Sequence, residues 1–214
     1  MSSFSGFYEP HQAKEVHVGY LPHWQQEDKW YFLTWRLADS IPREKLKSHL
    51  AQQALWLSQH PKPWDAKTER MFYERFPQQI EKWIDQGGGE CWLADAVHAQ
   101  IIASALDYFD HVRYRIACYV IMPNHVHLLL RIINKHTLED VNHSIKRYTA
   151  TKINQRLGRT GQFWHHESWD RLVRSEKHFF KIVSYIENNP VKARLKKGQY
   201  LLKCYKRGNN EAFE

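Results

Sequence analysis

Two apolar segments joined by a very short connection constrain the fold of this chain most. Residues 114–121 and 125–132 consist mainly of aliphatic and aromatic side chains, and Met122-Pro123-Asn124 links them. Segments of this length and composition favour β-strands, and so short a link favours antiparallel pairing. The sequence therefore predicts a β-hairpin near the middle of the chain.

A pair of histidines opens the second of these segments. Because side chains alternate faces along a strand, His125 and His127 are expected to point to the same side, roughly 7 Å apart. That spacing can chelate a metal ion. Two half-exposed histidines on a wet sheet face would give the same pattern, so the pair alone leaves both interpretations open.

The remaining patterns supply the other elements of the fold. Residues 30–37 are aromatic and β-branched enough for a first strand, whereas residues 1–27 are polar and aperiodic, which favours an extended arm. This order of strands and helices is typical of an α+β fold with helices packed on one face of a small antiparallel sheet. The predicted helices span residues 43–59, 64–86, 95–109, 138–157 and 176–188.

Charge is divided unevenly along the chain. Residues 131–214 carry 18 Lys and Arg against 8 Asp and Glu, whereas residues 1–130 carry 13 against 15. The basic part also contains tryptophans and tyrosines, a combination that suits phosphate contacts and base stacking. The sequence therefore predicts a nucleic acid as the partner.

The cysteines and the start of the chain bear on the cellular compartment. Cys91, Cys118 and Cys204 are odd in number and scattered, so ordinary reduced thiols are expected. No apolar run reaches the length of a membrane helix, and residues 1–5 show no basic flank followed by an apolar region. We expect a cytoplasmic, nucleoid-associated protein without a membrane partner.

A second group of chemically capable residues lies on the last predicted helix. Tyr185 and Asn189 are four residues apart, so they lie above each other on one face. Pro190 disfavours helical geometry at Asn189, which is expected to sit at a frayed helix end and turn toward a neighbouring element. A rim tyrosine followed by a helix-ending Asn-Pro is the alternative interpretation.

Three motifs in this order resemble the single-tyrosine HUH transposases of the REP-associated type, over roughly residues 30–195. They are Met122-Pro123-Asn124-His125-Val126-His127, Phe163-Trp164, and the segment that runs from Tyr185 through Asn189 to Ala193. The resemblance implies a ferredoxin-like or RRM-like sheet. It also implies that Tyr185 is the nucleophile and that His125, His127 and Asn189 hold Mg²⁺ or Mn²⁺.

Tyr148 competes with Tyr185 for the role of nucleophile. Leu138, Val141, Ile145 and Tyr148 recur at helical spacing, which predicts that Tyr148 packs on an apolar stripe. The fourth residue after it is Lys152, a cation that would not ligate a metal ion. Tyr185 is therefore the preferred candidate.

The resemblance further implies a substrate and a reaction. The substrate is single-stranded DNA with a hairpin, such as a REP-like palindrome, and cleavage leaves a 5′-phosphotyrosine. Members of this class act as monomers or homodimers, so the resemblance leaves the oligomeric state open. The candidate DNA contacts are Lys146, Arg147, Lys152, Arg156, Arg159, Arg171, Arg174, Lys181, Lys192 and Arg194.

The chain departs from a minimal member of that family outside the motifs. We expect a transposase domain over residues 28–200 with a helical insertion at about 60–95, preceded by the arm over 1–27 and followed by a basic tail over 201–214. Two alternatives stay open: a non-catalytic domain that binds nucleic-acid hairpins, and a metal-dependent hydrolase that uses water as the nucleophile.

Overall fold

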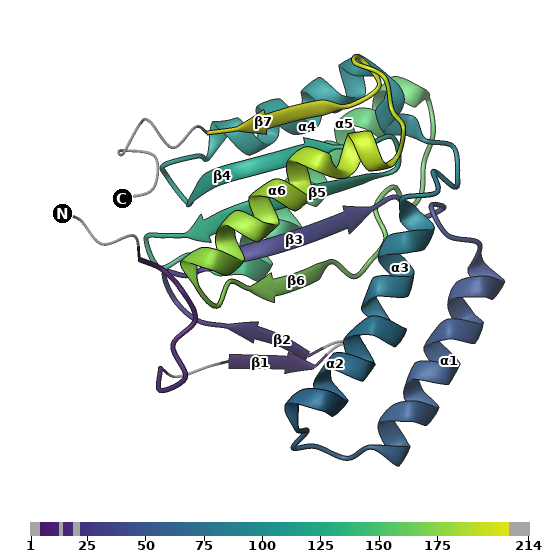
Figure 1. The fold of residues 1–214 in the computed structure, drawn as a ribbon. Coiled ribbons are helices and arrows are strands. Elements are labelled where there is room, and N and C mark those ends of the chain that lie inside the picture. The colour runs from purple at the N-terminus through teal and green to yellow at the C-terminus, as the bar shows by residue number, and fades with distance from the viewer. Residues whose placement is uncertain (1–4, 13–14, 19–21, 206–214) are drawn as a thin grey trace.

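A five-stranded antiparallel sheet forms the centre of the computed structural model, which describes residues 5–12, 15–18 and 22–205. The strand order is β6-β3-β5-β4-β7 (Figure 1). The predicted hairpin is confirmed, because neighbouring strands β4 and β5 pair antiparallel. The strands are β3 (Trp30–Arg36), β4 (Tyr114–Ile121), β5 (His125–Ile132), β6 (Trp169–Leu172) and β7 (Leu201–Cys204).

Helices cover both faces of this sheet. α4 (Ala96–Tyr108) and α5 (Leu138–Leu157) pack on one face, and α6 (Glu176–Lys192) crosses the other (Figure 1). The predicted α+β antiparallel class is confirmed, but the expectation that helices lie on one face only is wrong. The reason is visible in β3, where every side chain is buried, as in strands that are covered on both sides.

α6 continues past the predicted end at residue 188. Pro190 lies inside the helix, which runs to Lys192. A proline removes one backbone donor, and near the end of a helix that loss is confined to the last turn. Both Asn189 and Pro190 are buried against the sheet, so tertiary packing holds this turn helical. The expected frayed end at Asn189 is therefore wrong.

A helical unit lies beside the sheet and includes the segment predicted as an insertion (Figure 1). It contains α1 (Arg43–Gln59), α2 (Ala66–Arg75) and α3 (Pro77–Ile84), followed by a short 3-10 turn, η1 (Trp92–Ala94). The predicted helix over 64–86 is two helices, because Pro77 begins α3. The ring of Trp56 in α1 packs on those of Phe72 and Phe76, so α1 belongs to the same helical unit, whose part from about residue 60 to 95 is called the insertion below.

The two ends of the chain differ from their predictions. The expected extended arm contains a two-stranded sheet of β1 (Glu15–Val18) and β2 (Pro22–Gln25). At the other end β7 pairs with β4, so residues 201–204 belong to the domain and not to a tail. Residues 206–214 lie outside the described part of the chain.

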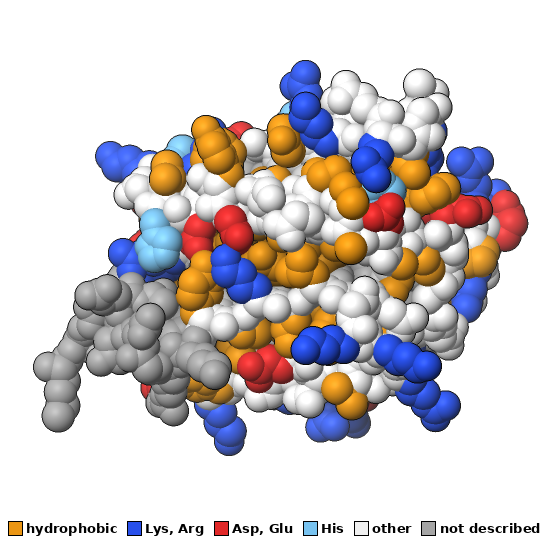
Figure 2. Space-filling model, turned by 90° about the horizontal axis from the view of Figure 1, so that it is seen from above, with side chains coloured by type: hydrophobic (Ala, Val, Ile, Leu, Met, Phe, Trp, Pro, Cys, Tyr) orange, Lys and Arg blue, Asp and Glu red, His pale blue; other side chains and the backbone are white. Residues whose placement is uncertain are grey.

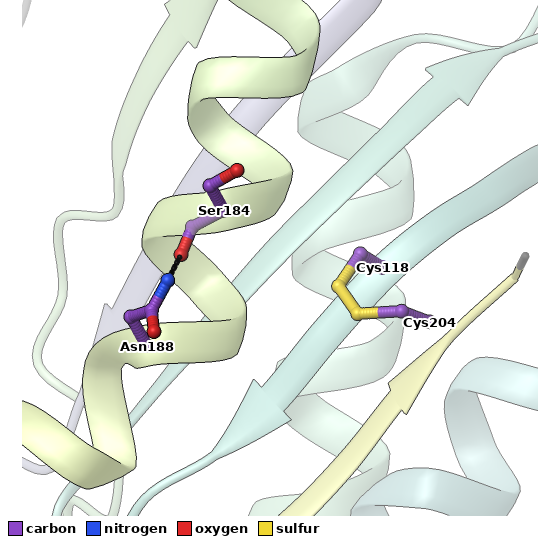
Figure 3. The surroundings of a disulfide bond; sticks show 4 residues. All are labelled: Cys118, Ser184, Asn188 and Cys204. Atoms are coloured by element: carbon purple, nitrogen blue, oxygen red, sulfur yellow. Dashed lines mark hydrogen bonds between the residues drawn. A yellow bond between two sulfur atoms is a disulfide. The ribbon is translucent and has the colours of Figure 1, made fainter.

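The pairing of β4 with β7 also joins two cysteines. Cys118 and Cys204 are opposite each other in register, their Cα atoms are 4.0 Å apart, and a disulfide links them (Figure 3). The expectation of reduced thiols is wrong for this pair, because a contact across 86 residues of sequence leaves no local spacing signal. Cys91 is a free thiol.

Charged groups and apolar groups share the molecular surface. On the side of the molecule seen from above, Lys and Arg side chains are spread around the rim and hydrophobic side chains run across the middle (Figure 2). In the described part of the chain, no helix combines the length and apolar character needed to cross a membrane.

Candidate active site

The histidine pair lies at the centre of the sheet, on the face that α6 covers. In register, His127 is opposite Thr34 of β3, and His125 is opposite Arg36. The two imidazole rings are 4.7 Å apart between centroids, as expected for side chains on one face. The alternative of histidines on a wet surface is wrong, because His125 is 1% exposed and His127 is 0% exposed.

The neighbours of His125 fix which of its nitrogens faces the site. Its Nδ1 is 2.7 Å from Oδ1 of Asn124, whose Nδ2 donates to the carbonyls of Ile84 and Gly88. Because the amide group uses its NH₂ for two carbonyls, its oxygen must accept a proton from Nδ1. His125 therefore presents the lone pair of Nε2. The same asparagine ties the end of the insertion to β5.

His127 is held in a similar way from the neighbouring strand. Its Nδ1 lies 2.8 Å from Oγ1 of Thr34, and both groups are buried. A hydroxyl can accept from Nδ1–H, which again leaves Nε2 as the free nitrogen. Hydrogen bonds of this kind orient imidazoles that bind metal ions.

Tyr185 and Asn189 approach the histidines from α6. The Tyr185 ring is 5.2 Å from the His127 ring and 5.7 Å from that of Phe32, measured between centroids. Asn189, one turn later, is 1% exposed. The adjacent Asn188 instead donates to the Ser184 carbonyl within α6 (Figure 3). Of the two asparagines, Asn189 is thus the one that lies on the sheet side of the helix.

Asp85 is a site residue that the sequence patterns missed. It follows the last residue of α3, and its Oδ1 lies 3.8 Å from Nε2 of His125. Its Oδ2 forms an ion pair with Nζ of Lys192 at 3.0 Å. No spacing links residue 85 to the histidine pair; the only available signal was an acidic residue two positions before the glycine triplet at 87–89.

The donor atoms that meet here fit a divalent cation. Ligand atoms of Asp85, His125 and His127 lie within 4.8 Å of one another. Imidazole nitrogens together with carboxylate and carboxamide oxygens are suitable ligands for such an ion. Among the described residues, the buried atoms without a hydrogen-bond partner include Asp85 Oδ1, His125 Nε2, His127 Nε2, Tyr185 Oη, and both Oδ1 and Nδ2 of Asn189.

Burial sets the protonation of these groups. It lowers the pKa of His125 to about 4, although nearby Asp85 raises it, and it holds the pKa of His127 well below the usual range. Both imidazoles are therefore neutral at neutral pH, the form that binds a metal ion. Burial also raises the pKa of Tyr185, and the negative charges of Glu81 and Asp85 raise it further. Tyr185 is therefore protonated at neutral pH and a weak nucleophile.

Tyr148 lies elsewhere and is exposed. Its side chain is 52% exposed on α5, so the prediction that it packs on the apolar stripe is wrong. The buried residues of α5 continue from Ile145 to Thr149 and Ile153, one position away from Tyr148. Because α5 covers the face opposite α6, the sheet separates Tyr148 from the histidine pair.

The candidate DNA contacts fall into three groups. Arg147, Lys152 and Arg156 are exposed on α5, behind the sheet. Lys146 and Arg159 are engaged within the protein: Lys146 donates to the carbonyls of His165 and His166 and to Ser168 Oγ, and Arg159 donates to the Gln162 carbonyl. The third group lies on β6 and α6 or directly after them and comprises Arg171, Arg174, Lys181, Lys192 and Arg194.

Part of the chain matches the sequence model of a known protein family. Residues 90–189 match the model of the family described as Transposase IS200 like. This segment holds the hairpin, α5 and α6 as far as Asn189, and its similarity agrees with the transposase resemblance of the motifs. Asp85 and the insertion helices lie outside it.

Two individual proteins are also similar. An uncharacterized protein of Haemophilus influenzae (strain ATCC 51907 / DSM 11121 / KW20 / Rd) is 27% identical over 105 residues, which cover 39% of this chain and 57% of that protein. The chain thus spans little more than half of that relative. The structure of a REP-associated tyrosine transposase bound to a REP hairpin superposes with a TM-score of 0.45 at 17% identity, over 85% of this chain and 77% of that chain.

Proposed function

We propose that this protein, a member of the IS200-like transposase family over residues 90–189, is a metal-dependent transposase that cuts and rejoins single-stranded DNA carrying a hairpin. One observation carries the proposal. Six buried polar atoms on Asp85, His125, His127, Tyr185 and Asn189 lack hydrogen-bond partners among the described residues and belong to one site. Unpaired buried polar atoms cost free energy, so their gathering supports a site built for a ligand.

Tyr185 acts as the nucleophile in this proposal. Its Oη loses its proton and forms a bond to the phosphorus of a phosphodiester, and the bond from phosphorus to the 3′-oxygen breaks. The departing oxygen takes up a proton and becomes a 3′-hydroxyl, while the 5′-phosphate stays on Tyr185. Attack by a 3′-hydroxyl on this phosphotyrosine reverses the reaction. One phosphodiester replaces another, so strand transfer needs no ATP.

The other residues hold and activate the reacting groups. His125, His127, Asp85 and Asn189 would hold Mg²⁺ or Mn²⁺, which would supply Lewis-acid stabilisation of charge on a scissile phosphate. The two nitrogen ligands favour Mn²⁺ over Mg²⁺. Lys192 lies beside Tyr185, with its Nζ 6.0 Å from the centre of the Tyr185 ring. It is therefore the candidate DNA contact that can reach a phosphate attacked by Tyr185.

A covalent-adduct assay tests the proposal. The probe is a pool of 3′-fluorescein-labelled single strands with a hairpin and randomised unpaired flanks, incubated with Mn²⁺ and resolved on a denaturing gel. A 3′ label is needed because the DNA on the 3′ side of the cut stays on the protein. We expect an adduct with the wild-type protein and with Tyr148→Phe, and none with Tyr185→Phe.

The alternatives give different results in the same assay. Tight binding of the pool without an adduct in Mn²⁺ or Mg²⁺ would identify a non-catalytic hairpin-binding domain. Cleavage that survives Tyr185→Phe would identify a hydrolase with a water nucleophile. Either result overturns the proposed reaction.

A further inference from the structure

A large cavity lies between the insertion and the edge of the sheet, outside the site described above. Its volume is about 770 Å³, and it is lined by residues of α2 and of β6 together with the segment that precedes α2. Small-molecule sites commonly occupy roughly 300–1,000 Å³, so the cavity can hold a ligand the size of one or two nucleotides. Most of its wall comes from the insertion.

Aromatic rings line this cavity from both sides. Trp64 and Phe72 come from the insertion, with ring centroids 4.9 Å apart, and Tyr73 of α2 faces Trp169 of β6 at 6.1 Å. All four side chains are only partly buried. Exposed aromatic faces of this kind are stacking surfaces for unpaired bases.

Two cationic side chains form cation–π contacts with these rings. Nζ of Lys62 is 4.9 Å from the Trp64 ring centroid, and the guanidinium of Arg171 is 4.7 Å from that of Tyr73. The acidic Glu69 in the same wall is paired with Arg174. The aromatic rings offer stacking surfaces for a base, and the cations offer contacts for a phosphate, so the wall suits a nucleotide.

The cavity is connected to Tyr185 through a single ring. Phe32 of β3 contacts Trp169 at 5.6 Å and Tyr185 at 5.7 Å, both edge to face. Trp169 therefore belongs to the cavity wall and Phe32 to the site. A DNA strand with its phosphate at Tyr185 has neighbouring nucleotides within reach of this wall.

We propose that the cavity between α2 and β6 binds an unpaired base next to the scissile phosphate, with Tyr73 and Trp169 as stacking surfaces and Arg171 as the phosphate contact. The proposal rests on the function proposed above, since it assumes a single-stranded DNA substrate. It gives the insertion a role in choosing the cleavage position. The α2 side of this pocket, with Tyr73, lies outside the segment matched by the family, and the β6 side, with Trp169 and Arg171, lies inside it.

An abasic scan tests this pocket. The probe is the hairpin strand that the wild-type protein retains best from the randomised pool, with each unpaired nucleotide replaced in turn by an abasic residue. Binding is measured by fluorescence anisotropy. Since stacking contributes about 1–3 kcal/mol per base, we expect one or two adjacent positions near the cut to weaken wild-type binding roughly 5- to 150-fold.

Variants assign this effect to the pocket. In Tyr73→Ala and in Arg171→Met the same abasic positions should have little further effect, whereas the exposed Tyr148→Ala on α5 should keep the wild-type profile. Thermal unfolding shows whether each variant is folded. If one of the two pocket variants is unfolded, the result with the other variant is used. The proposal is overturned if no abasic position weakens binding by the wild-type protein, or if both pocket variants keep the wild-type profile. It is also overturned if the wild-type protein retains no strand from the pool.

The scan also separates this inference from the proposed reaction. It is repeated with Tyr185→Phe, which cannot form the adduct. A position-specific loss in that variant supports the pocket even if no adduct is ever seen, and an adduct with a flat scan supports the reaction while overturning the pocket.

Discussion

The Oδ1 atom of Asp85 lies 3.8 Å from Nε2 of His125, and neither atom has a hydrogen-bond partner among the described residues. The carboxylate comes from the end of α3, in the insertion, and the imidazole from the central strand of the sheet. A bound cation would convert this contact into two metal bonds. The insertion thus contributes to the candidate active site as well as to the neighbouring cavity.

Asp85→Asn should weaken metal binding by the protein alone. Removing even an outer partner of a metal ligand typically costs about 10–100-fold in affinity, so we expect at least about a 10-fold loss for Mn²⁺, measured by calorimetry. The control is Glu44→Gln, which changes an exposed carboxylate on α1. Equal Mn²⁺ affinity in the two variants would show that Asp85 does not bind the metal ion and has only its ion pair with Lys192.

Thr34→Val should act on the metal through His127. Valine keeps the shape of threonine but removes the oxygen that lies 2.8 Å from Nδ1, so the imidazole loses the bond that orients it. We expect a roughly 10-fold loss in Mn²⁺ affinity, again by calorimetry. Thr34→Ser, which keeps the hydroxyl, should restore binding. A loss that serine does not restore would point to a packing defect instead.

Tyr185→Phe should stabilise the metal-free protein while it abolishes the adduct. The buried Tyr185 hydroxyl has no partner among the described residues, and leaving such a group unpaired costs about 1–3 kcal/mol. We expect the free energy of unfolding in EDTA to rise by about 1 kcal/mol in urea titrations. Tyr114→Phe is the matched control. It removes a hydroxyl that donates to the Leu106 carbonyl, so it should destabilise the protein. If Tyr185→Phe lowers the free energy of unfolding instead, the inference that the Tyr185 hydroxyl is unpaired is wrong.

Glu81→Gln should stabilise the protein increasingly as the pH rises above about 4.5. Burial, with help from the charge of Asp85, raises the pKa of Glu81 from 4.5 to about 7. The folded state thus binds this proton more tightly than the unfolded state, so the carboxyl lowers stability as pH rises from 4.5 through 7. The difference between variant and wild type should grow from near zero below pH 4.5 to at most about 3 kcal/mol above pH 7.

Urea titrations in EDTA at a series of pH values measure this difference. Glu90→Gln is the control, because Glu90 is an exposed acidic residue near the same end of the insertion. A stability difference that does not depend on pH would show that Glu81 titrates normally.

Local patterns were sufficient for the hairpin and for the chemical candidates on it. Strand alternation put His125 and His127 on one face, and helical periodicity put Tyr185 above Asn189. The same reasoning was wrong at Tyr148 by one position, because the buried stripe of α5 passes through Thr149. A hydrophobic stripe on a helix covers a broad sector of its surface. Whether a residue at the edge of that sector is buried depends on the element that packs against the helix.

The sequence by itself determined the α+β class, the hairpin, the shared face of the two histidines and the shared face of Tyr185 and Asn189, because these follow from backbone periodicity within short segments. The link between the two pairs came from the resemblance of the motifs. Only the tertiary structure decided that α6 covers the histidine face, that Asn189 is buried in an unbroken helix, and that Asp85 completes the group. These are contacts between segments 40 to 100 residues apart. They depend on how the insertion and α6 pack on the sheet, and no repeat or spacing in the chain records that packing.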